Sequence, residues 1–463
     1  MAEPMLSVEE ALERVLSEFH PLEPERVPIL EALGRVLAED VYADVDVPPH
    51  ANSSMDGFAV RAADTAGAGR QSPVRLRVIA DLPAGYVSQV DVTPGTAIRI
   101  MTGAQIPPGA DAVVRVEDTA AAGEPLPQPL PSQGRGEWVD VFTTVPIGEY
   151  VRPAGEDVRR GELVLRRGTL IRPQEVGMLA TLGRKEVLAI RRPRVAILAT
   201  GDEVVEVDAP LAPGKIRNAN SYSNAAQVIQ YGGIPVMLGI ARDQVQELTE
   251  RIRAGLAQGV DLFLTSGGVS VGDFDVVKDV LAAEGEIHFW RVRIKPGKPL
   301  AFGRLSPLPH REGQGEGGLC GLWASHPHPN PLPGRERRQF PLPYREGQGE
   351  GVPLLGLPGN PVSVMVAFEM FARPAILKMR GLTEWERPTV VATLMDEVKH
   401  KDNRRHYLRV RLEEQDGEYR AYLTGEQGSG ILSSMVRANA LAIVPEEWSH
   451  APAGARVRVM LLD

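Results

Sequence analysis

The stretch Thr265-Ser266-Gly267-Gly268-Val269-Ser270-Val271-Gly272-Asp273-Phe274-Asp275 follows the apolar run Leu262-Phe263-Leu264 and precedes a helical pattern that begins at Val276. This order predicts a buried strand, a glycine-rich turn and a helix. The glycines let the backbone approach a ligand closely, and the amides at a helix start can hold an anion. The carboxylates of Asp273 and Asp275 would repel a bare anion unless a hard cation lies between them. We therefore expect an anionic ligand, most simply a phosphorylated one, that is bound together with Mg²⁺.

The residues around this stretch alternate between apolar strands and helices. Strands are predicted at residues 195–199, 234–240 and 261–264, and helices at residues 224–231 and 244–256. Such alternation predicts a parallel, doubly wound sheet, in which ligands bind at the carboxyl ends of the strands. Thr200-Gly201-Asp202-Glu203 and Arg242-Asp243 follow the first two strands. Three acidic loops are thus expected to meet at one edge, although Asp243 alone would more often be a helix N-cap.

Two proline- and glycine-rich turns lie further along the chain. Lys295-Pro296-Gly297-Lys298-Pro299 places two lysines on a rigid turn. A single lysine is usually a solvated surface charge, but two lysines near an acidic magnesium-type site are better interpreted as anion holders. Leu357-Pro358-Gly359-Asn360-Pro361-Val362-Ser363 then leads from a strand into a long apolar helix that ends near Met379.

Residues 306–352 separate these two turns and are rich in Pro, Gly, Arg and Glu. Residues 307–317 and 341–351 form an internal repeat that differs only at His310 and Tyr344. This composition cannot build a core, and loop-closure entropy grows slowly with length, so we expect an extended, dispensable excursion from a hairpin tip. The spacing of Cys320, His326 and His328 matches no zinc-binding framework.

The flanking regions predict further domains. Helices are expected at residues 8–18, where Ser7 and Glu10 have capping-box spacing, and at residues 28–37 and 170–182. Short strands predict a mostly-β region before residue 151 and a small β region after residue 386. We therefore divide the chain into a helical domain from residues 1–45 and 152–190, an inserted mostly-β domain at 46–151, an α/β domain at 191–385, and a C-terminal β domain at 386–463.

Two loops of the mostly-β region present polar side chains. Asn52-Ser53-Ser54-Met55-Asp56-Gly57 stands between a proline turn and an apolar strand, and Met101-Thr102-Gly103 follows another strand. Asp56-Gly57 alone is typical of a tight turn, but its polar neighbours favour a functional loop. Asp111, a few residues after Thr102, is a second candidate carboxylate.

The composition limits the classes of function. A chain of 463 residues with 43% hydrophobic residues is typical of a globular protein with several cores. The net charge of −9 argues against nucleic-acid binding, and no apolar span or signal-peptide core indicates a membrane. The single cysteine, Cys320, fits a reducing compartment, so we expect a cytoplasmic location.

Taken together, the motifs resemble the molybdopterin molybdenumtransferase family, the MoeA-type enzymes that include the gephyrin E domain. The resemblance covers nearly the whole chain and rests on six motifs in the family's order, the polar loops and turns quoted above. It implies an elongated multidomain chain of α/β plus β class, with a doubly wound MogA-like α/β domain, an inserted mostly-β domain, a helical lead-in and a small C-terminal β domain.

The resemblance also implies an activity, its substrates and its site. The family inserts molybdate into adenylylated molybdopterin, releases AMP with Mg²⁺, and works as a homodimer in which the Asp56 loop of one subunit faces the α/β domain of the other. A handover of the pterin from the molybdopterin adenylyltransferase is also implied. The matching catalytic positions are Asp56, Thr102, Glu203, Asp243, Asp275, Lys295 and Lys298, with Glu203, Asp243 and Asp275 as metal ligands. The matching substrate-binding positions are Ser266, Gly267, Gly268, Ser270, Gly272, Pro358, Asn360, Ser363, Arg404 and Ser429, where Arg405 and Arg409 compete with Arg404.

Two other functions remain open at this point. The related α/β adenylyltransferase that activates molybdopterin shares the glycine-rich turn, although the flanking β regions favour the molybdenumtransferase. A gephyrin-like binding or scaffold protein would need no acidic loops. The sequence does not indicate how molybdate is distinguished from tungstate.

Overall fold

The computed structural model describes residues 5–120, 137–267, 280, 283–306, 351–399 and 402–462. The chain divides into two compact units. The larger unit contains residues 1–24 and 190–463, and the smaller unit contains residues 25–189. The first helix therefore belongs with the α/β region, whereas the division into four domains stays a prediction.

A six-stranded sheet forms the centre of the larger unit. Its strands, in spatial order, are β15 Ile234–Ala241, β12 Arg194–Thr200, β16 Leu262–Ser266, β20 Val352–Leu357, β19 Pro299–Leu305 and β17 Gly285–Arg291. The first four strands are parallel, as predicted, and the last two add antiparallel pairs at one edge. The inner strands are parallel and covered on both faces, which explains why β12 and β16 read as continuous apolar runs.

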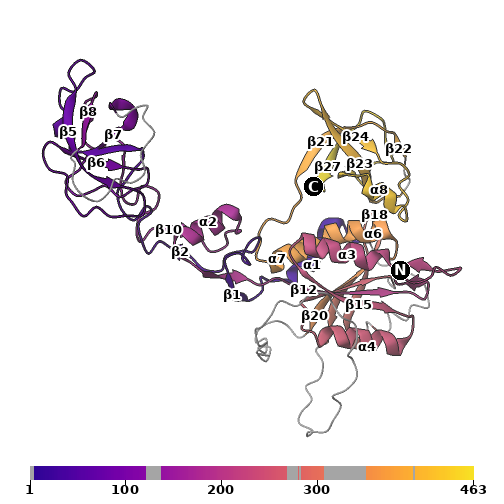
Figure 1. Cartoon of the computed structure of the whole chain (residues 1–463). Helices are drawn as coiled ribbons and strands as arrows, with labels where there is room; N and C mark the ends of the chain where they lie inside the picture. Colours follow the sequence, from indigo (N-terminus) through magenta and orange to yellow (C-terminus); the bar gives the residue numbers. More distant parts are fainter. Residues whose placement is uncertain are drawn as a thin grey trace, which may run out of the picture. The chain divides into compact units, whose positions relative to one another are not determined.

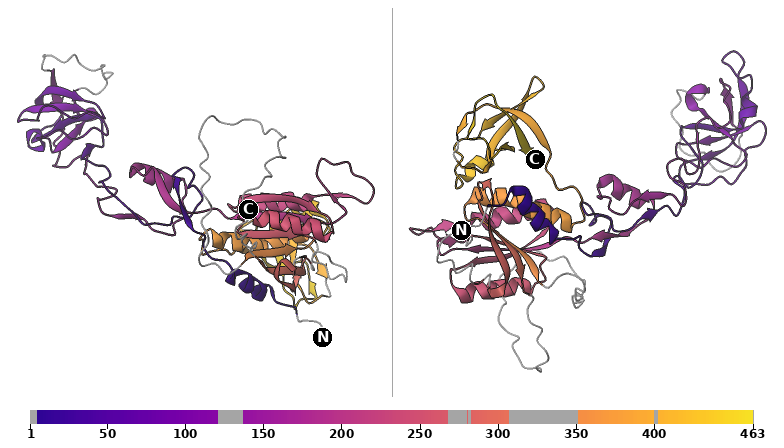
Figure 2. Two further views of the ribbon diagram at one scale, coloured as in Figure 1. Left: turned by 90° about the horizontal axis from the view of Figure 1, so that it is seen from below. Right: turned by 180° about the vertical axis from the view of Figure 1, so that it is seen from behind.

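Helices cover both faces of this sheet, so the expected doubly wound architecture is confirmed (Figure 1). One face carries α3 Ala219–Gln230 and the segment α6 Pro361–Ala367, η3 Phe368–Ala372 and α7 Arg373–Met379, and the other carries α4 Val245–Leu256. Figure 2 shows the same layers from two other directions. On the α4 face, Leu248 and Ile252 pack against Phe263 and Leu238 of the sheet.

The chain leaves β12 for β15 on one side and returns to β16 on the other side of β12. This reversal makes the carboxyl ends of β12 and β16 a topological switch point, where ligands bind in open α/β sheets. Two of the acidic or glycine-rich segments predicted from the sequence begin there, at Thr200 and Ser266. The fold thus places the predicted motifs at the position where such sheets bind ligands.

The first helix, α1 Val8–Ser17, has the capping box predicted from its sequence. The Ser7 amide donates to Glu10 Oε2 at 2.7 Å, and the Glu10 amide donates to Ser7 Oγ at 3.1 Å. These two bonds satisfy amides that the first turn of a helix leaves without intrahelical partners.

The C-terminal strands form a closed sheet, in agreement with the predicted small β region. Its strands are β21 Thr389–Leu394, β23 Arg405–Gln415, β24 Glu418–Leu423, β25 Ala440–Val444 and β27 Arg456–Leu461, and β23 pairs with β25 to complete the ring. The short strand β18 Ile294–Lys295 pairs in parallel with β23. Smaller elements are α8 Leu432–Val436, β22 Val398–Lys399 and β26 His450–Ala451. Through β18, the lysine turn is joined directly to the C-terminal sheet.

The smaller unit is mostly β. Five strands pair in the order β7 Ala112–Arg115, β4 Gly57–Val60, β6 Thr96–Ile100, β5 Val74–Leu82 and β8 Glu137–Val141. Shorter elements are β1 Pro24–Pro28, β2 Val41–Tyr42, β3 Asn52–Ser53, η1 Ala62–Thr65, η2 Val116–Asp118, β9 Val151–Arg152, β10 Leu163–Leu165, α2 Pro173–Thr181 and β11 Glu186–Ile190. The predicted mostly-β character of this region is confirmed, and so is the helix predicted at residues 170–182, which corresponds to α2.

The helix predicted at residues 28–37 is wrong. Residues 29–34 form turns with short internal hydrogen bonds, and other backbone groups of the segment pair with residues 169–188, so no regular helix forms. The Leu37 amide donates to Thr169 O, and the Ala38 amide donates to Leu188 O. Leu30 and Leu33, which gave the segment its helical spacing, are exposed, so the apolar pattern did not mark a buried helix face.

The hairpin expected around residues 306–352 is confirmed at its base. Strand β19 pairs with β20 in antiparallel register, and Leu305 lies opposite Val352. The predicted extended excursion, with Cys320, His326 and His328, lies outside the described residues.

Candidate active site

A small pocket lies at the switch point of the central sheet. Its volume is about 90 Å³, and its walls come from the ends of β12 and β16, from the start of α3 and from the turn after β20. The lining includes Thr200, Glu203, Asn218, Asn220, Ser266, Gly267 and Gly359. Glu203, Ser266 and Gly267 are predicted site residues, whereas the two asparagines were missed. The polar run Arg217-Asn218-Ala219-Asn220-Ser221 before an apolar pattern was the signal that could have indicated them.

The turn after β12 folds back on itself at Gly201. Its φ is +131°, and a Cβ at this position would lie 2.6 Å from Glu203 Oε2. Only glycine combines this conformation with so close an approach of the carboxylate. The local sequence thereby holds Glu203 at the pocket wall.

Two of the three predicted acidic loops meet. The Asp243 amide, after β15, lies 3.4 Å from Asp202 Oδ1 as a long hydrogen bond. Burial raises the pKa of Asp243, and the negative charges of Asp202 and Glu203 raise it further. Carboxylates that repel one another in this way are the hard oxygen ligands that a divalent cation would stabilise. The third loop, with Asp273 and Asp275, lies outside the described residues.

No group of three or more His, Cys, Asp or Glu side chains in the described ranges is arranged to hold a metal ion. The predicted ligand set combined Glu203 and Asp243 with Asp275, so the described residues contain only two of its members. Magnesium binding by this set stays a prediction.

The start of the glycine-rich stretch packs tightly against the turn after β12. A Cβ on Gly267, whose φ is +95°, would lie 2.8 Å from Thr200 Oγ1. The preceding residue, Ser266, is buried, and within the described part of the chain its hydroxyl has no hydrogen-bond partner. Because Ser266 also lines the pocket, its hydroxyl is suited to bind a polar ligand group there. Gly268, Ser270 and Gly272 lie outside the described residues.

The turn after β20 connects the pocket with the C-terminal sheet. Asn220 Nδ2 of α3 donates to Gly359 O at 2.7 Å, and Asn360 Nδ2 donates to Ser429 Oγ at 3.0 Å. The amide of Val362 donates to Ser429 O at 3.0 Å. The structure therefore brings Asn360 and Ser429 together, although 69 residues separate them in the sequence.

The lysine turn packs against the helix α6, which begins at Pro361. A Cβ on Gly297 would lie 3.5 Å from the carbonyl oxygen of Ser363, which is buried. Lys295 Nζ lies 2.9 Å from Asp402 Oδ2, and Arg404 donates to the same oxygen. The structure thus brings Lys295 and Arg404 together on one carboxylate that sequence reasoning missed. Lys298 is half-buried on the same turn.

The competing arginines have other partners. Arg405 pairs with Glu446, with Nε 2.9 Å from Oε2, and also with Glu9. Arg409 is buried and donates to Ser434 Oγ at 3.0 Å and to Gly428 O at 3.1 Å. Burial lowers the pKa of Arg409 to about 10. These contacts favour Arg404 as the anion-holding residue and give Arg409 a role in positioning the loop that carries Ser429.

In the smaller unit, the structure brings Asp56 and Thr102 together. The Thr102 amide and hydroxyl both donate to Asp56 Oδ1, at 2.7 and 2.9 Å. Both residues are exposed. Asp111, by contrast, accepts from the Ala62 amide at 2.6 Å at the start of η1, so its role is structural.

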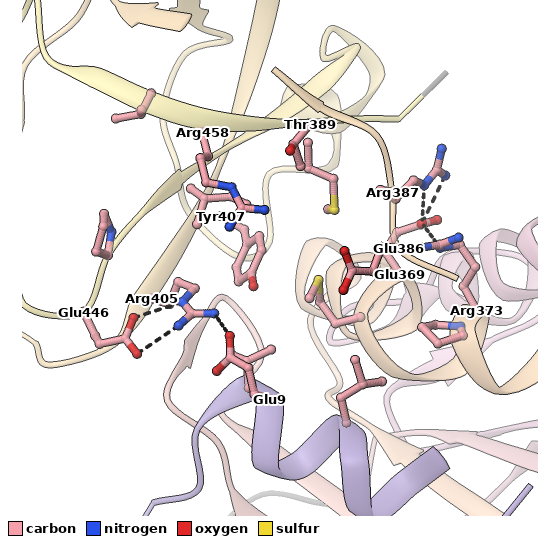
Figure 3. A pocket seen from close by; sticks show the side chains of 18 of the residues that line it. Glu9, Glu369, Arg373, Glu386, Arg387, Thr389, Arg405, Tyr407, Glu446 and Arg458 are labelled. Carbon is pink, nitrogen blue, oxygen red and sulfur yellow. Dashed lines mark hydrogen bonds and ion pairs between the residues drawn. The ribbon is translucent and has the colours of Figure 1, made fainter. Parts of the chain in front are cut away.

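A wider cavity of about 570 Å³ is lined by Arg405, one of the two arginines that compete with Arg404, and by none of the other predicted site residues (Figure 3). It lies in the larger unit between α1, the η3 and α7 helices and the C-terminal sheet. Several of its charged groups form ion pairs: Arg405 with Glu446 and Glu9, and Arg373 and Arg387 with the buried Glu369. Volume alone therefore does not identify the site that the predicted residues form.

Fold and site together define a multidomain α/β protein with acidic and basic loops gathered at the carboxyl ends of a doubly wound sheet. Three family models match the chain: the MoeA N-terminal region (domain I and II) at residues 6–183, a probable molybdopterin binding domain at residues 196–378, and the MoeA C-terminal region (domain IV) at residues 391–462. Together they span both units.

Relatives match over nearly their full length. A molybdopterin molybdenumtransferase of a Nostoc species is 35% identical, with 95% of this chain and 88% of the relative covered. The enzyme of the same name from Bacillus subtilis is 33% identical, with 99% and 94% covered. The crystal structure of a molybdopterin biosynthesis MoeA protein from Pyrococcus horikoshii aligns with a TM-score of 0.75 at 29% identity and covers 99% of this chain and 100% of that one. The chain belongs to the MoeA family of molybdopterin molybdenumtransferases.

Proposed function

We propose that the protein inserts molybdate into adenylylated molybdopterin, with Mg²⁺-dependent release of AMP, as a step of molybdenum cofactor biosynthesis. The observation that carries this proposal is the placement of acidic loops and cationic turns around the carboxyl ends of one sheet. A phosphoanhydride and a tetrahedral oxyanion both need cations and fixed donors around them. Relatives at 33–35% identity carry the name of this activity.

The roles of the residues follow from their chemistry. Glu203 and Asp243, together with Asp275, would hold Mg²⁺, which when bound neutralises charge on the phosphate groups of the substrate. Lys295, Lys298 and Arg404 would hold the oxyanion, with Ser363 and Ser429 as neutral donors. The Ser266 hydroxyl and the glycine-rich stretch would face the pterin phosphate.

The turn that carries Asp202 and Glu203 is held in place by the segment that follows it. Lys215 Nζ donates to Asp202 O at 2.6 Å, and the Ile216 amide donates to Glu203 O at 2.9 Å. The segment of β13 Val204–Val205 and β14 Ile216–Arg217 therefore fixes the backbone from which the Asp202 and Glu203 side chains project. Fixed groups stabilise a transition state without the cost of reorganising during the reaction.

A test of the activity supplies adenylylated molybdopterin, molybdate and Mg²⁺ and measures AMP release. The wild-type protein should release AMP only when all three are present, and Asp275→Asn and Asp243→Asn should each slow release. Unchanged release in Asp275→Asn would refute its magnesium role. Synthesis of adenylylated molybdopterin from ATP without molybdate would instead identify the adenylyltransferase.

The functional form in this proposal is a cytoplasmic homodimer in which the Asp56 loop of one subunit completes the site of the other. Mixing inactive Asp56→Asn and Asp243→Asn subunits tests this arrangement. Half of the randomly formed dimers are mixed and each has one intact site, so about a quarter of the wild-type activity should return. If each site used one chain only, mixing would restore nothing.

Among the described residues, none of the helices has both the length and the apolar composition that a membrane span requires.

A further inference from the structure

Asp402 lies at the centre of a group of cationic and polar side chains in the larger unit. Its Oδ2 is 2.9 Å from Lys295 Nζ and also accepts from Arg404, and its Oδ1 is 2.6 Å from His406 Nε2. The register of β18 and β23 explains this meeting, because Lys295 lies opposite His406 in the parallel pair. The carboxylate is therefore held from two directions by strand pairing.

The position of the Asp402 carboxylate is accessible to a ligand. The side chains of Lys295, Asp402 and Arg404 are 43%, 29% and 23% exposed, whereas His406 is buried beneath them. Two cations that would hold an oxyanion thus share one oxygen of a carboxylate at the protein surface. A carboxylate oxygen and an oxygen of a tetrahedral oxyanion make the same charge-assisted contacts to such donors.

We propose that Asp402 is an internal counter-ion that occupies the oxyanion position beside Lys295 and Arg404 until a tetrahedral oxyanion displaces it. This inference rests on the proposed function, in which Lys295 and Arg404 bind such an anion. Asp402 is a positioning residue in this scheme, because it acts through the two cations and leaves them when the anion binds.

The charge state of Asp402 supports this role. Its partial burial acts to raise its pKa, but the hydrogen bonds from His406, Lys295 and Arg404 outweigh that effect and hold the pKa well below its usual range. The carboxylate is therefore negative at neutral pH and keeps the two cations from repelling each other. An entering anion must compete with the Asp402 carboxylate for Lys295 and Arg404. The observed affinity of the anion is therefore reduced by the fraction of molecules in which Asp402 occupies the oxyanion position.

The same contacts allow a contrasting role, in which Asp402 only orients Lys295 and Arg404 for the anion. The two roles predict opposite results when the charge is removed. An internal counter-ion lowers the affinity for anions, so its removal tightens binding. An orienting residue raises that affinity, so its removal weakens binding.

The experiment titrates the full-length wild-type protein, Asp402→Asn and Asp402→Ala with molybdate, and in separate arms with sulfate and AMP, by calorimetry at neutral pH. The two variants should bind molybdate roughly 3- to 30-fold more tightly than the wild type, because the competing carboxylate is gone. Tighter binding of AMP alone would identify the nucleotide phosphate as the oxyanion that displaces Asp402. Glu397→Gln is the matched control, because Glu397 loses the same charge but pairs with Lys399 and His450.

Turnover gives a second readout. The returning carboxylate helps release the bound anion, so Asp402→Asn should lower KM for molybdate and also lower kcat. Weaker or unchanged binding of every anion by both folded variants, with normal binding by the wild type, overturns the inference and leaves the proposed function standing. Failure of the wild type to bind any of the three anions overturns the inference together with the anion-holding role of Lys295 and Arg404.

Discussion

Thr102 donates both its backbone amide and its hydroxyl to one oxygen of Asp56, at 2.7 and 2.9 Å. Residues 46 positions apart thereby fix a carboxylate at the surface of the smaller unit. The loop is itself held, since Ser54 Oγ donates to Tyr150 O at 3.1 Å and the Gly103 amide donates to Ser53 O at 2.8 Å. An exposed carboxylate that is oriented by two donors is better suited to a reaction than to stabilising the fold.

Replacing Thr102 should therefore affect activity more than stability. Thr102→Val removes the hydroxyl donor and leaves the amide, and we expect AMP release to fall by roughly tenfold with an almost unchanged melting temperature. Asp56→Asn should cost more, on the order of the 10²- to 10⁴-fold that a catalytic acid or base contributes. Thr102→Ser keeps the hydroxyl and is the control. Full activity of Thr102→Val would show that the contact is only structural.

The sequence predicted those features of the fold that depend on local pattern. The continuous apolar runs of β12 and β16 identified buried parallel strands, and parallel topology then placed Glu203, Asp243 and Ser266 at one edge. Those inferences need no knowledge of side-chain partners, because the carboxyl ends of parallel strands always share an edge.

Features that depend on pairing between distant segments could not be predicted. Asp402 meets Lys295 only because β18 pairs with β23 in one particular register, and 107 residues separate the two side chains. Residues 28–37 have an apolar spacing typical of a helix, yet their backbone groups pair with residues 169–188. Tertiary pairing decided both cases over local preference.

The pair of Arg405 and Glu446 predicts a pH dependence of stability. Arg405 donates to both carboxylate oxygens of Glu446, at 2.9 and 3.1 Å. Burial acts to raise the pKa of Glu446, but the Arg405 hydrogen bonds outweigh it, so the pKa lies below its ordinary value of 4.5. The stabilisation is therefore fully present above about pH 4.5 and is lost as the pH falls through the lowered pKa of the folded state.

Glu446→Gln should accordingly lower the free energy of unfolding at pH 7 by about 1 kcal/mol for a half-buried pair, which is measured as a lower urea midpoint. The difference from the wild type should shrink as the pH is lowered below 4.5. Glu447→Gln removes the same charge from the next residue of the same cavity wall and should change the midpoint little at either pH. A Glu446→Gln effect that does not depend on pH would contradict an ionic role.

Two glycines of the smaller unit should respond in opposite ways to replacement by alanine. A Cβ on Gly57 would lie 1.9 Å from the carbonyl oxygen of Val114, where β4 pairs with β7, so Gly57→Ala should destabilise the sheet by more than about 2 kcal/mol. Gly177 lies exposed in α2 with nothing near its added Cβ, so Gly177→Ala should stabilise the protein by up to about 1 kcal/mol. Thermal unfolding of both variants measures the contrast, and equal effects would contradict the packing at Gly57.

The base of the β19 and β20 hairpin defines where residues 307–350 can be removed. Leu305 pairs with Val352, so joining Ser306 directly to Gly351 leaves a two-residue connection. Such connections favour Asn followed by Gly, and Ser306→Asn would supply the first of these. The deletion keeps Val352, which belongs to β20, and so preserves the strand pair.

This deletion variant should fold with a melting temperature close to that of the wild type and release AMP within a few-fold of the wild-type rate. The reason is that closing a long loop contributes an entropy that depends only weakly on its length, while the paired strands on both sides remain intact. The matched comparison is a second deletion that also removes Val352. Because this deletion takes away the β20 residue that pairs with Leu305, it should lower stability. Loss of activity in the first variant with the fold preserved would show that residues 307–350 take part in the reaction.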